Sequence, residues 1–142
     1  MPKVQDPILE SPKVAERFWA KFRKTEGCWE WRGSKARDGY GIFWHKGRQL
    51  SAHRLVYTLT SGPIPPGLTL DHLCRNTGCV NPSHLEPVSM RENTLRGTTG
   101  PAQNARKTQC QYGHSFDLFN TYYWHQHRIC RMCRRLRRQA KE

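Results

Sequence analysis

The segment that decides the fold reads LDHLCRNTGCVNPSHL over residues 70–85, and it contains three metal-ligating side chains at even spacing. Four residues separate Cys74 from Cys79, and four more separate Cys79 from His84. A structural zinc site requires four ligands in a tetrahedral arrangement. The spacing therefore predicts a zinc loop whose fourth ligand comes from elsewhere in the chain. Cys28 is the candidate, because it is the only other cysteine in the first 96 residues.

A second cluster of cysteine and histidine lies near the C-terminus. Three residues separate Cys110 from His114, and two separate Cys130 from Cys133. Two short ligand pairs with a hairpin-sized insert between them are typical of a zinc ribbon or knuckle. Together the two clusters use all six cysteines as two sites of three cysteines and one histidine. Free buried thiols or disulfides are the alternative, but paired cysteines in a reducing compartment more often bind metal.

The composition of the 142-residue chain agrees with zinc as a structural element and points to a polyanionic partner. Hydrophobic residues make up 36% of the chain, which is low for a well-filled core that has no metal to support it. The net charge of +13 favours nucleic acid as the partner. The sequence contains no apolar run long enough for a membrane span, and residues 1–10 lack the apolar core of a signal peptide. We therefore expect a cytoplasmic protein that does not bind a membrane.

Local patterns predict short helices and antiparallel strands. Ser11 and Pro12 are typical of a helix start, and Ser89 with Glu92 forms a capping box. The turn pair at 46–47 joins two strand-like segments. The predicted helices cover residues 12–26, 52–59, 90–96 and 129–141, and the predicted strands cover 39–44, 48–51 and 68–70.

The same patterns predict three regions along the chain. Residues 1–96 would contain the N-terminal helix, the β-hairpin and the first zinc site. The breaker-rich start of 97–109 predicts a linker. Residues 110–142 would contain the second zinc site and a basic C-terminal helix.

Three residues that the zinc sites do not use have the chemistry of phosphodiester hydrolysis. His72 ends a predicted strand two residues before Cys74, Asp71 precedes it, and Asn93 follows 21 residues later. A neutral imidazole accepts a proton from water near pH 7. Carboxylate and amide oxygens suit Mg²⁺ or Mn²⁺, which can polarise a phosphate. On spacing alone, a structural or phosphate-binding role for His72 is the commoner alternative.

The run over residues 70–85 resembles the HNH endonucleases of phage and homing type, and it is especially similar to the His-Cys box homing endonucleases. Both groups belong to the ββα-metal nuclease superfamily. The resemblance extends more loosely from residue 16 to 133, with CWEW at 28–31, YGIF at 40–43 and AHR at 52–54. It implies an α+β protein with the ββα-metal (His-Me finger) nuclease fold, small antiparallel β elements, short helices and two structural zinc sites. It also implies a location in a bacterial or phage-infected host cell.

Carried over position by position, the resemblance implies that His72 is the general base and that Asn93 binds the catalytic metal. It implies a structural zinc at Cys74, Cys79 and His84 with Cys28 as the upstream ligand. The second zinc site, formed by Cys110, His114, Cys130 and Cys133, matches more loosely because its spacing varies among relatives.

The resemblance also assigns roles to Arg48 and Asp71, and at Asp71 the chain departs from the His-Cys box pattern. Arg48 falls where the His-Cys box enzymes place an arginine near the scissile phosphate. Those enzymes lack an acidic residue immediately before the base. Asp71 instead resembles the Asp-His pair of the broader HNH group, in which the aspartate binds the catalytic metal. Orientation of His72 by Asp71 is the alternative.

Basic residues predict how double-stranded DNA is held. Arg37, Lys46 and Arg48 lie on or near the predicted hairpin, and a two-stranded ribbon can enter the major groove. The last predicted helix is expected to supply phosphate contacts that carry no sequence information. These contacts would come from Arg131, Arg134, Arg135 and Arg138. A solvated hairpin packed on the first helix and a solvated basic tail are the alternatives.

These observations favour a metal-dependent DNA endonuclease. The resemblance implies that its products carry a 5′ phosphate and a 3′ hydroxyl. A homodimer stays open, since His-Cys box relatives can dimerise. A zinc-dependent DNA-binding regulator that does not cut would need the zinc ligands and the arginines, but not Asp71, His72 and Asn93 together. A ribosome-associated RNA-binding protein is a weaker third hypothesis. The motifs leave open the target sequence, the number of strands cut, and a role in intron mobility, genome packaging or defence.

Overall fold

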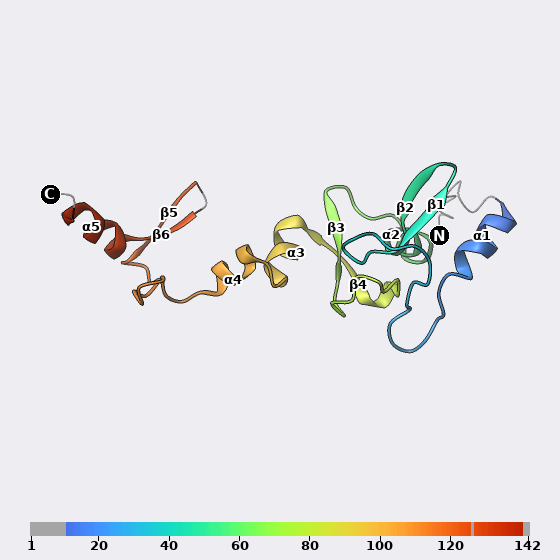
Figure 1. Cartoon of the computed structure of the whole chain (residues 1–142), viewed down its shortest axis with the longest axis horizontal. Helices are drawn as coiled ribbons and strands as arrows, with labels where there is room; N and C mark the ends of the chain where they lie inside the picture. Colours follow the sequence, from blue (N-terminus) through green and yellow to red (C-terminus); the bar gives the residue numbers. More distant parts are fainter. Residues whose placement is uncertain (1–10, 126, 141–142) are drawn as a thin grey trace. The chain divides into compact units, whose positions relative to one another are not determined.

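A computed structural model describes residues 11–125 and 127–140, and it divides into two compact units between Asn93 and Thr94 (Figure 1). The sequence placed this boundary three residues later. Residues 1–10, where we expected no signal peptide, and residue 141, the predicted end of the last helix, lie outside the described residues. None of the helices described is both long enough and apolar enough to pass through a bilayer.

The N-terminal unit begins with helix α1 (Pro12–Trp19), which has proline in its first turn as predicted. The helix is shorter than the expected 12–26. After Ala20 the chain turns, and Phe22 forms an isolated antiparallel bridge with Trp31 instead of continuing the helix. Phe22 nevertheless stays buried, so the apolar spacing correctly marked a core residue but not the helix end.

The core of this unit is a cluster of aromatic rings. Phe18 packs edge-on against Phe43, with ring centroids 5.0 Å apart, and against Phe22 at 6.0 Å. Aromatic side chains bury a large area each, so a few of them build a core in a chain of low apolar content. Gly41 is required beside them, because a Cβ there would lie 2.7 Å from the Trp31 ring. The buried members are Phe18, Phe22, Trp31, Phe43, Ala52, Leu55, Val56 and Val80.

A β-hairpin and a helix complete this packing. Strands β1 (Ile42–His45) and β2 (Arg48–Ser51) pair antiparallel, as the sequence predicted. The turn residues Lys46 and Gly47 both have positive φ, 47° and 74°, which suits a two-residue hairpin turn. Helix α2 (Ala52–Ser61) follows directly, and Gly62 ends it.

The second hairpin of the unit has the predicted ββα arrangement. Strands β3 (Leu68–His72) and β4 (Leu85–Ser89) pair antiparallel, with His72 opposite Leu85. The loop between them contains the short 3-10 helix η1 (Pro82–His84). Helix α3 (Met90–Arg96) follows β4, and Ser89 Oγ accepts a 3.1 Å hydrogen bond from the Glu92 amide, as expected for the capping box. Small antiparallel sheets and short helices confirm the α+β class and are consistent with the HNH fold.

The C-terminal unit is built from helix α4 (Gly100–Arg106), the hairpin β5 (Thr121–Trp124) and β6 (His127–Cys130), and helix α5 (Arg131–Gln139). The stretch expected to be a linker, 97–109, thus contains a helix. Ile129 lies in β6 and not in the last helix, contrary to the sequence prediction. The helix begins only at Arg131 because Cys130 is its N-cap, with Sγ accepting from the Cys133 amide.

Candidate active site and metal sites

A short bridge between two distant segments builds the first metal cluster. The Trp31 amide donates to the Gly78 carbonyl at 3.0 Å, and the Val80 amide donates to the Trp29 carbonyl at 2.9 Å. These bonds hold residues 29–31 against the loop after β3. Cys28 therefore lies beside the loop cysteines, although it is far from them in the sequence.

The geometry of this cluster fits zinc. The ligand atoms of Cys28, Cys74, Cys79 and His84 all lie within 4.8 Å of one another. The Sγ atoms of Cys28 and Cys79 are each 3.6 Å from His84 Nδ1. Tetrahedral coordination with ordinary zinc–sulfur and zinc–nitrogen bond lengths gives a separation of about 3.5 Å. Burial raises the pKa of the Cys79 thiol to about 12, so a thiolate there needs a cation beside it.

Asn81 organises the same loop and was not singled out from the sequence. This buried side chain donates from Nδ2 to the Gly27 carbonyl at 2.8 Å and accepts at Oδ1 from the Ser83 amide at 3.1 Å. The backbone N–H of Asn81 donates to Cys79 Sγ at 3.4 Å. One residue thus fixes the segment before Cys28 and supports a ligand sulfur.

The second cluster has the same ligand set in the C-terminal unit. The ligand atoms of Cys110, His114, Cys130 and Cys133 also lie within 4.8 Å of one another. His114 Nδ1 is 3.2 Å from Cys133 Sγ and 3.4 Å from Cys110 Sγ. Asn120 supports it, with Nδ2 donating to Cys130 Sγ at 3.3 Å. Both predicted ligand sets are brought together, and both clusters could hold zinc.

The loop of the first cluster also fixes the imidazole of His72. Its Nε2 lies 3.1 Å from the backbone carbonyl oxygen of Cys79. A carbonyl oxygen only accepts hydrogen bonds, so Nε2 must carry the proton in this contact. In that neutral tautomer the lone pair is on Nδ1, which is the form that a general base requires.

Two residues that the sequence did not select surround this ring. The ring centroid of His72 is 4.9 Å from that of His53 and 5.5 Å from that of Tyr40. His53 Nδ1 lies 3.0 Å from Ser51 Oγ at the start of α2. In the sequence, His53 is part of the AHR run at 52–54. Its burial is a property of the folded chain, so the sequence alone has no signal that marks it.

Burial sets the protonation of this cluster. It lowers the pKa of His53 to about 3, with a smaller contribution from the charge of His72. Burial also lowers the pKa of His72, although the hydrogen bond to Cys79 and the charge of Asp71 act in the opposite direction. It raises the pKa of Tyr40. The three side chains are therefore neutral near pH 7, and His72 is 5% exposed.

The other three expected catalytic residues lie in different surroundings, one buried, one on a helix and one exposed on a strand. Asp71 is 2% exposed, and its Oδ1 accepts from Arg75 Nη1 at 2.8 Å. Asn93 lies on α3, one turn after the Ser89 cap. Arg48 is exposed at the start of β2. Among the described residues, the hydrogen bonds and ring contacts of His72 do not include Asn93 or Arg48.

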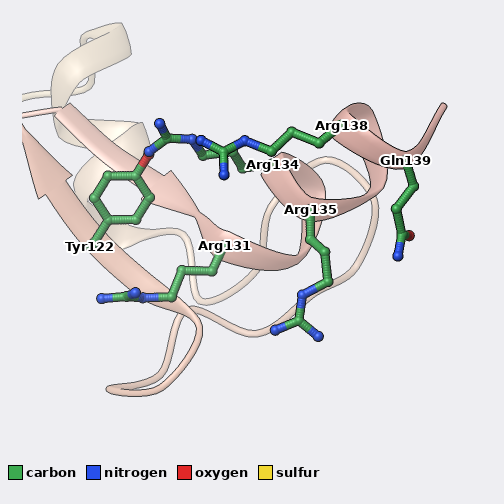
Figure 2. A pocket seen from close by; sticks show the side chains of 6 residues that line it. All are labelled: Tyr122, Arg131, Arg134, Arg135, Arg138 and Gln139. Atoms are coloured by element: carbon green, nitrogen blue, oxygen red, sulfur yellow. The ribbon is translucent and has the colours of Figure 1, made fainter. Parts of the chain in front are cut away.

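The expected DNA-binding residues are all exposed. Arg37, Lys46 and Arg48 are exposed in the N-terminal unit. In the C-terminal unit, arginines of α5 line a hollow of about 470 Å³ beside Tyr122 (Figure 2). These arginines are Arg131, Arg134, Arg135 and Arg138.

Comparison with known proteins gives a family for part of the chain and phage proteins as relatives. Residues 51–95 match the HNH endonuclease family. Protein 7.7 of Escherichia phage T7 is 38% identical over 69 residues, which are 49% of this chain and 53% of that protein. Protein 2.8 of the same phage is 33% identical over 94 residues, 65% of this chain and 58% of that protein. An uncharacterized gene 5.3 protein of Enterobacteria phage T3 is 41% identical over 44 residues, 31% and 44% of the two chains.

The chain thus spans about half the length of the curated relatives it matches. No solved structure matches it. The family match covers α2, the β3–β4 hairpin with its zinc loop, and all but the last residue of α3. It therefore contains Asp71, His72 and Asn93, which lie in the ββα arrangement described above. The resemblance to the HNH endonucleases is confirmed over residues 51–95 by this match.

Proposed function

We propose that the protein is a metal-dependent DNA endonuclease in which His72 is the general base. The observation that carries the proposal is the hydrogen bond between His72 Nε2 and the Cys79 carbonyl oxygen. It holds the imidazole in the tautomer with a lone pair on Nδ1, within a domain of the HNH family. DNA is the substrate that such a domain implies, and the exposed basic residues agree with it.

The proposed reaction is hydrolysis of one phosphodiester bond. His72 Nδ1 takes a proton from a water molecule while the water oxygen forms a bond to phosphorus. The bond from phosphorus to the 3′ oxygen breaks, and that oxygen takes a proton from solvent. The products carry a 5′ phosphate and a 3′ hydroxyl. The lowered pKa of His72 keeps the ring in its accepting form at neutral pH.

We propose that Asn93 and Asp71 would hold a catalytic Mg²⁺ or Mn²⁺ ion. Their amide and carboxylate oxygens are hard donors, which is the chemistry such ions prefer. When bound, the ion stabilises negative charge on the phosphate and on the leaving oxygen. Asp71 Oδ1 accepts a hydrogen bond from Arg75, so this guanidinium and the ion would interact with the same carboxylate. Arg48 is proposed to contact the scissile phosphate, where its guanidinium would neutralise charge.

The two cysteine–histidine clusters are proposed to bind one structural zinc ion each. Metal analysis of the purified protein should then give two zinc ions per chain. Arg37, Lys46 and the α5 arginines are proposed to contact DNA phosphates. The phage origin of the relatives supports a location in the infected host cell. The proposed chemistry uses residues of one chain, and light scattering measures whether the chain forms a homodimer.

A plasmid assay tests the proposal. The wild-type protein with Mg²⁺ or Mn²⁺ should give relaxed or linear plasmid, and His72→Ala should reduce the rate by about 10²–10⁴-fold. His72→Ala should keep its zinc and its DNA affinity. His45→Ala is the matched control, since this histidine of the same unit should be dispensable. Equal cleavage by wild type and His72→Ala would refute the general base, and DNA binding without cleavage by wild type would favour the regulator.

A further inference from the structure

The hairpin of the C-terminal unit leaves two large aromatic side chains in solvent. Trp124 is 63% exposed and Tyr123 is 69% exposed. Among the aromatic rings of the described residues, Trp124 pairs only with the neighbouring ring of His125, edge-on. Exposed rings of this size at adjacent positions are unusual on a surface that has no partner.

Strand geometry places Trp124 on the same face as Tyr122. The register pairs Tyr122 with Ile129 and Trp124 with His127, and side chains alternate along a strand. Tyr122 and Trp124 therefore point to one face, about 6.6 Å apart along β5, and Tyr123 points to the other. One face of the hairpin thus carries the exposed ring of Trp124 with the half-buried ring of Tyr122 next to it.

Tyr122 connects this face to the arginines of α5. Its hydroxyl accepts a hydrogen bond from Arg134 Nη1. The guanidinium carbons of Arg131 and Arg134 lie 5.2 and 5.4 Å from the centre of its ring. Figure 2 shows Arg134 and Arg138 extending from α5 toward Tyr122. Tyr122 therefore belongs both to the arginine-lined hollow and to this aromatic face of the hairpin, which we call the Trp124 face.

The chemistry of this surface selects one class of ligand. Residues 121–140 contain no acidic side chain, so the surface matches a polyanion. Guanidinium groups contact phosphates, and an exposed indole stacks on the face of a base. In a duplex the base faces are covered by their neighbours in the stack, so a protruding ring finds no partner there. Unpaired bases offer that partner.

We infer that the C-terminal unit binds single-stranded DNA, with phosphates in the arginine-lined hollow and a base stacked on Trp124. The inference rests on the proposed function in taking DNA as the ligand, but it does not require cleavage. It assigns to this unit a preference for DNA that contains an unpaired segment. The N-terminal unit would then cut DNA that the other unit holds next to such a segment.

Binding of labelled oligothymidine and of a blunt duplex, followed by fluorescence anisotropy, tests the inference. The full-length protein is used without added Mg²⁺ or Mn²⁺ and without chelator, so that zinc is retained. Trp124→Ala should weaken single-strand binding by about tenfold, because stacking contributes substantially per base. Its effect on duplex binding should stay within about twofold, because phosphate contacts dominate there. Trp124→Phe should recover most of the single-strand affinity.

Tyr123→Ala is the matched control, because this neighbouring ring is at least as exposed but lies on the opposite face. It should leave both affinities within about twofold, since it removes no predicted stacking partner. Zinc content and far-ultraviolet circular dichroism establish that each variant is folded. Unchanged single-strand binding by Trp124→Ala would overturn the inference.

Equal loss of single-strand and duplex affinity in Trp124→Ala would also overturn it and would make the surface a phosphate-binding one. An equal loss of single-strand affinity in Tyr123→Ala would contradict the assignment of base stacking to the Trp124 face. The plasmid assay with His72→Ala is read separately, so failure of the nuclease proposal and failure of this inference give different results.

Discussion

The two units of this protein use the same ligand set but differ in what surrounds it. In the N-terminal unit the cysteine–histidine cluster adjoins a core of packed aromatic rings. In the described part of the C-terminal unit, the buried apolar residues are Ala102 and the ligand Cys130. The comparison indicates that a zinc ion at each cluster would supplement a core in one unit and would replace it in the other, as in small metal-folded domains.

The largest expected effect is loss of the C-terminal fold in Cys133→Ser. Structural zinc contributes about 10–16 kcal/mol in small domains, and this unit has little else to hold it. The variant should bind one zinc ion instead of two, and its hairpin and α5 resonances should collapse to random-coil positions in NMR spectra. The N-terminal unit should stay folded. Native chemical shifts for β5, β6 and α5 in this variant would contradict a fold that depends on zinc.

Cys79→Ser should damage the other unit in a different way. It removes a zinc ligand and disturbs the carbonyl that fixes His72, so we expect loss of cleavage together with loss of cooperative unfolding of this unit. Circular dichroism melting and the plasmid assay measure the two effects. A melting profile equal to that of the wild type would contradict a structural zinc at this position. The zinc of the C-terminal unit should be retained.

Phe18→Ala tests how much the aromatic core stabilises the N-terminal unit. Removing a fully buried phenylalanine typically costs about 3–5 kcal/mol, because it leaves a cavity. Chemical denaturation should show that loss in the N-terminal unit alone, with both zinc ions still bound. Phe119→Ala is the control, since this ring is almost fully exposed in the C-terminal unit and its removal should change stability by less than about 0.5 kcal/mol.

The smallest expected effect is on the pH dependence of cleavage. A base must be neutral to accept a proton, and burial lowers the pKa of His72 below its ordinary value of 6.5. Activity should therefore persist below pH 6.5 and fall only as the pH drops through the lowered value. Initial rates across pH, with zinc content checked at each point, measure it. An acid limb above pH 6.5 would contradict the burial effect.

Local spacing predicted what local contacts determine. Cys74, Cys79 and His84 lie within one loop, and the capping box at Ser89 starts α3 at the expected residue. Cys28 was the candidate for the fourth ligand because no other cysteine of the first 96 residues was left. The bridge that places it beside the loop joins residues some fifty positions apart. A single sequence carries no pattern for such a long-range pairing, so the reason for its position appears only in the structure.

Tertiary contacts also explain what the sequence missed. Tyr40 and His53 surround His72 because three separate elements meet there, which no periodicity records. Helix α4 begins within a run of glycine, threonine and proline that reads as a breaker. Proline in the first turn is equally compatible with a helix start. Ile129 lies in β6 because α5 begins only after its N-cap, Cys130. A cysteine is not a common N-cap residue, so the sequence did not indicate this helix start.

Cys79 has two functions in one residue, since its sulfur belongs to the metal cluster and its carbonyl oxygen holds the imidazole. Under the proposed mechanism, the enzyme cannot be assembled in an active form before this ion is loaded. Loading of the cluster and orientation of the proposed base would then be a single event, so a chain without this ion would stay inactive at any Mg²⁺ concentration.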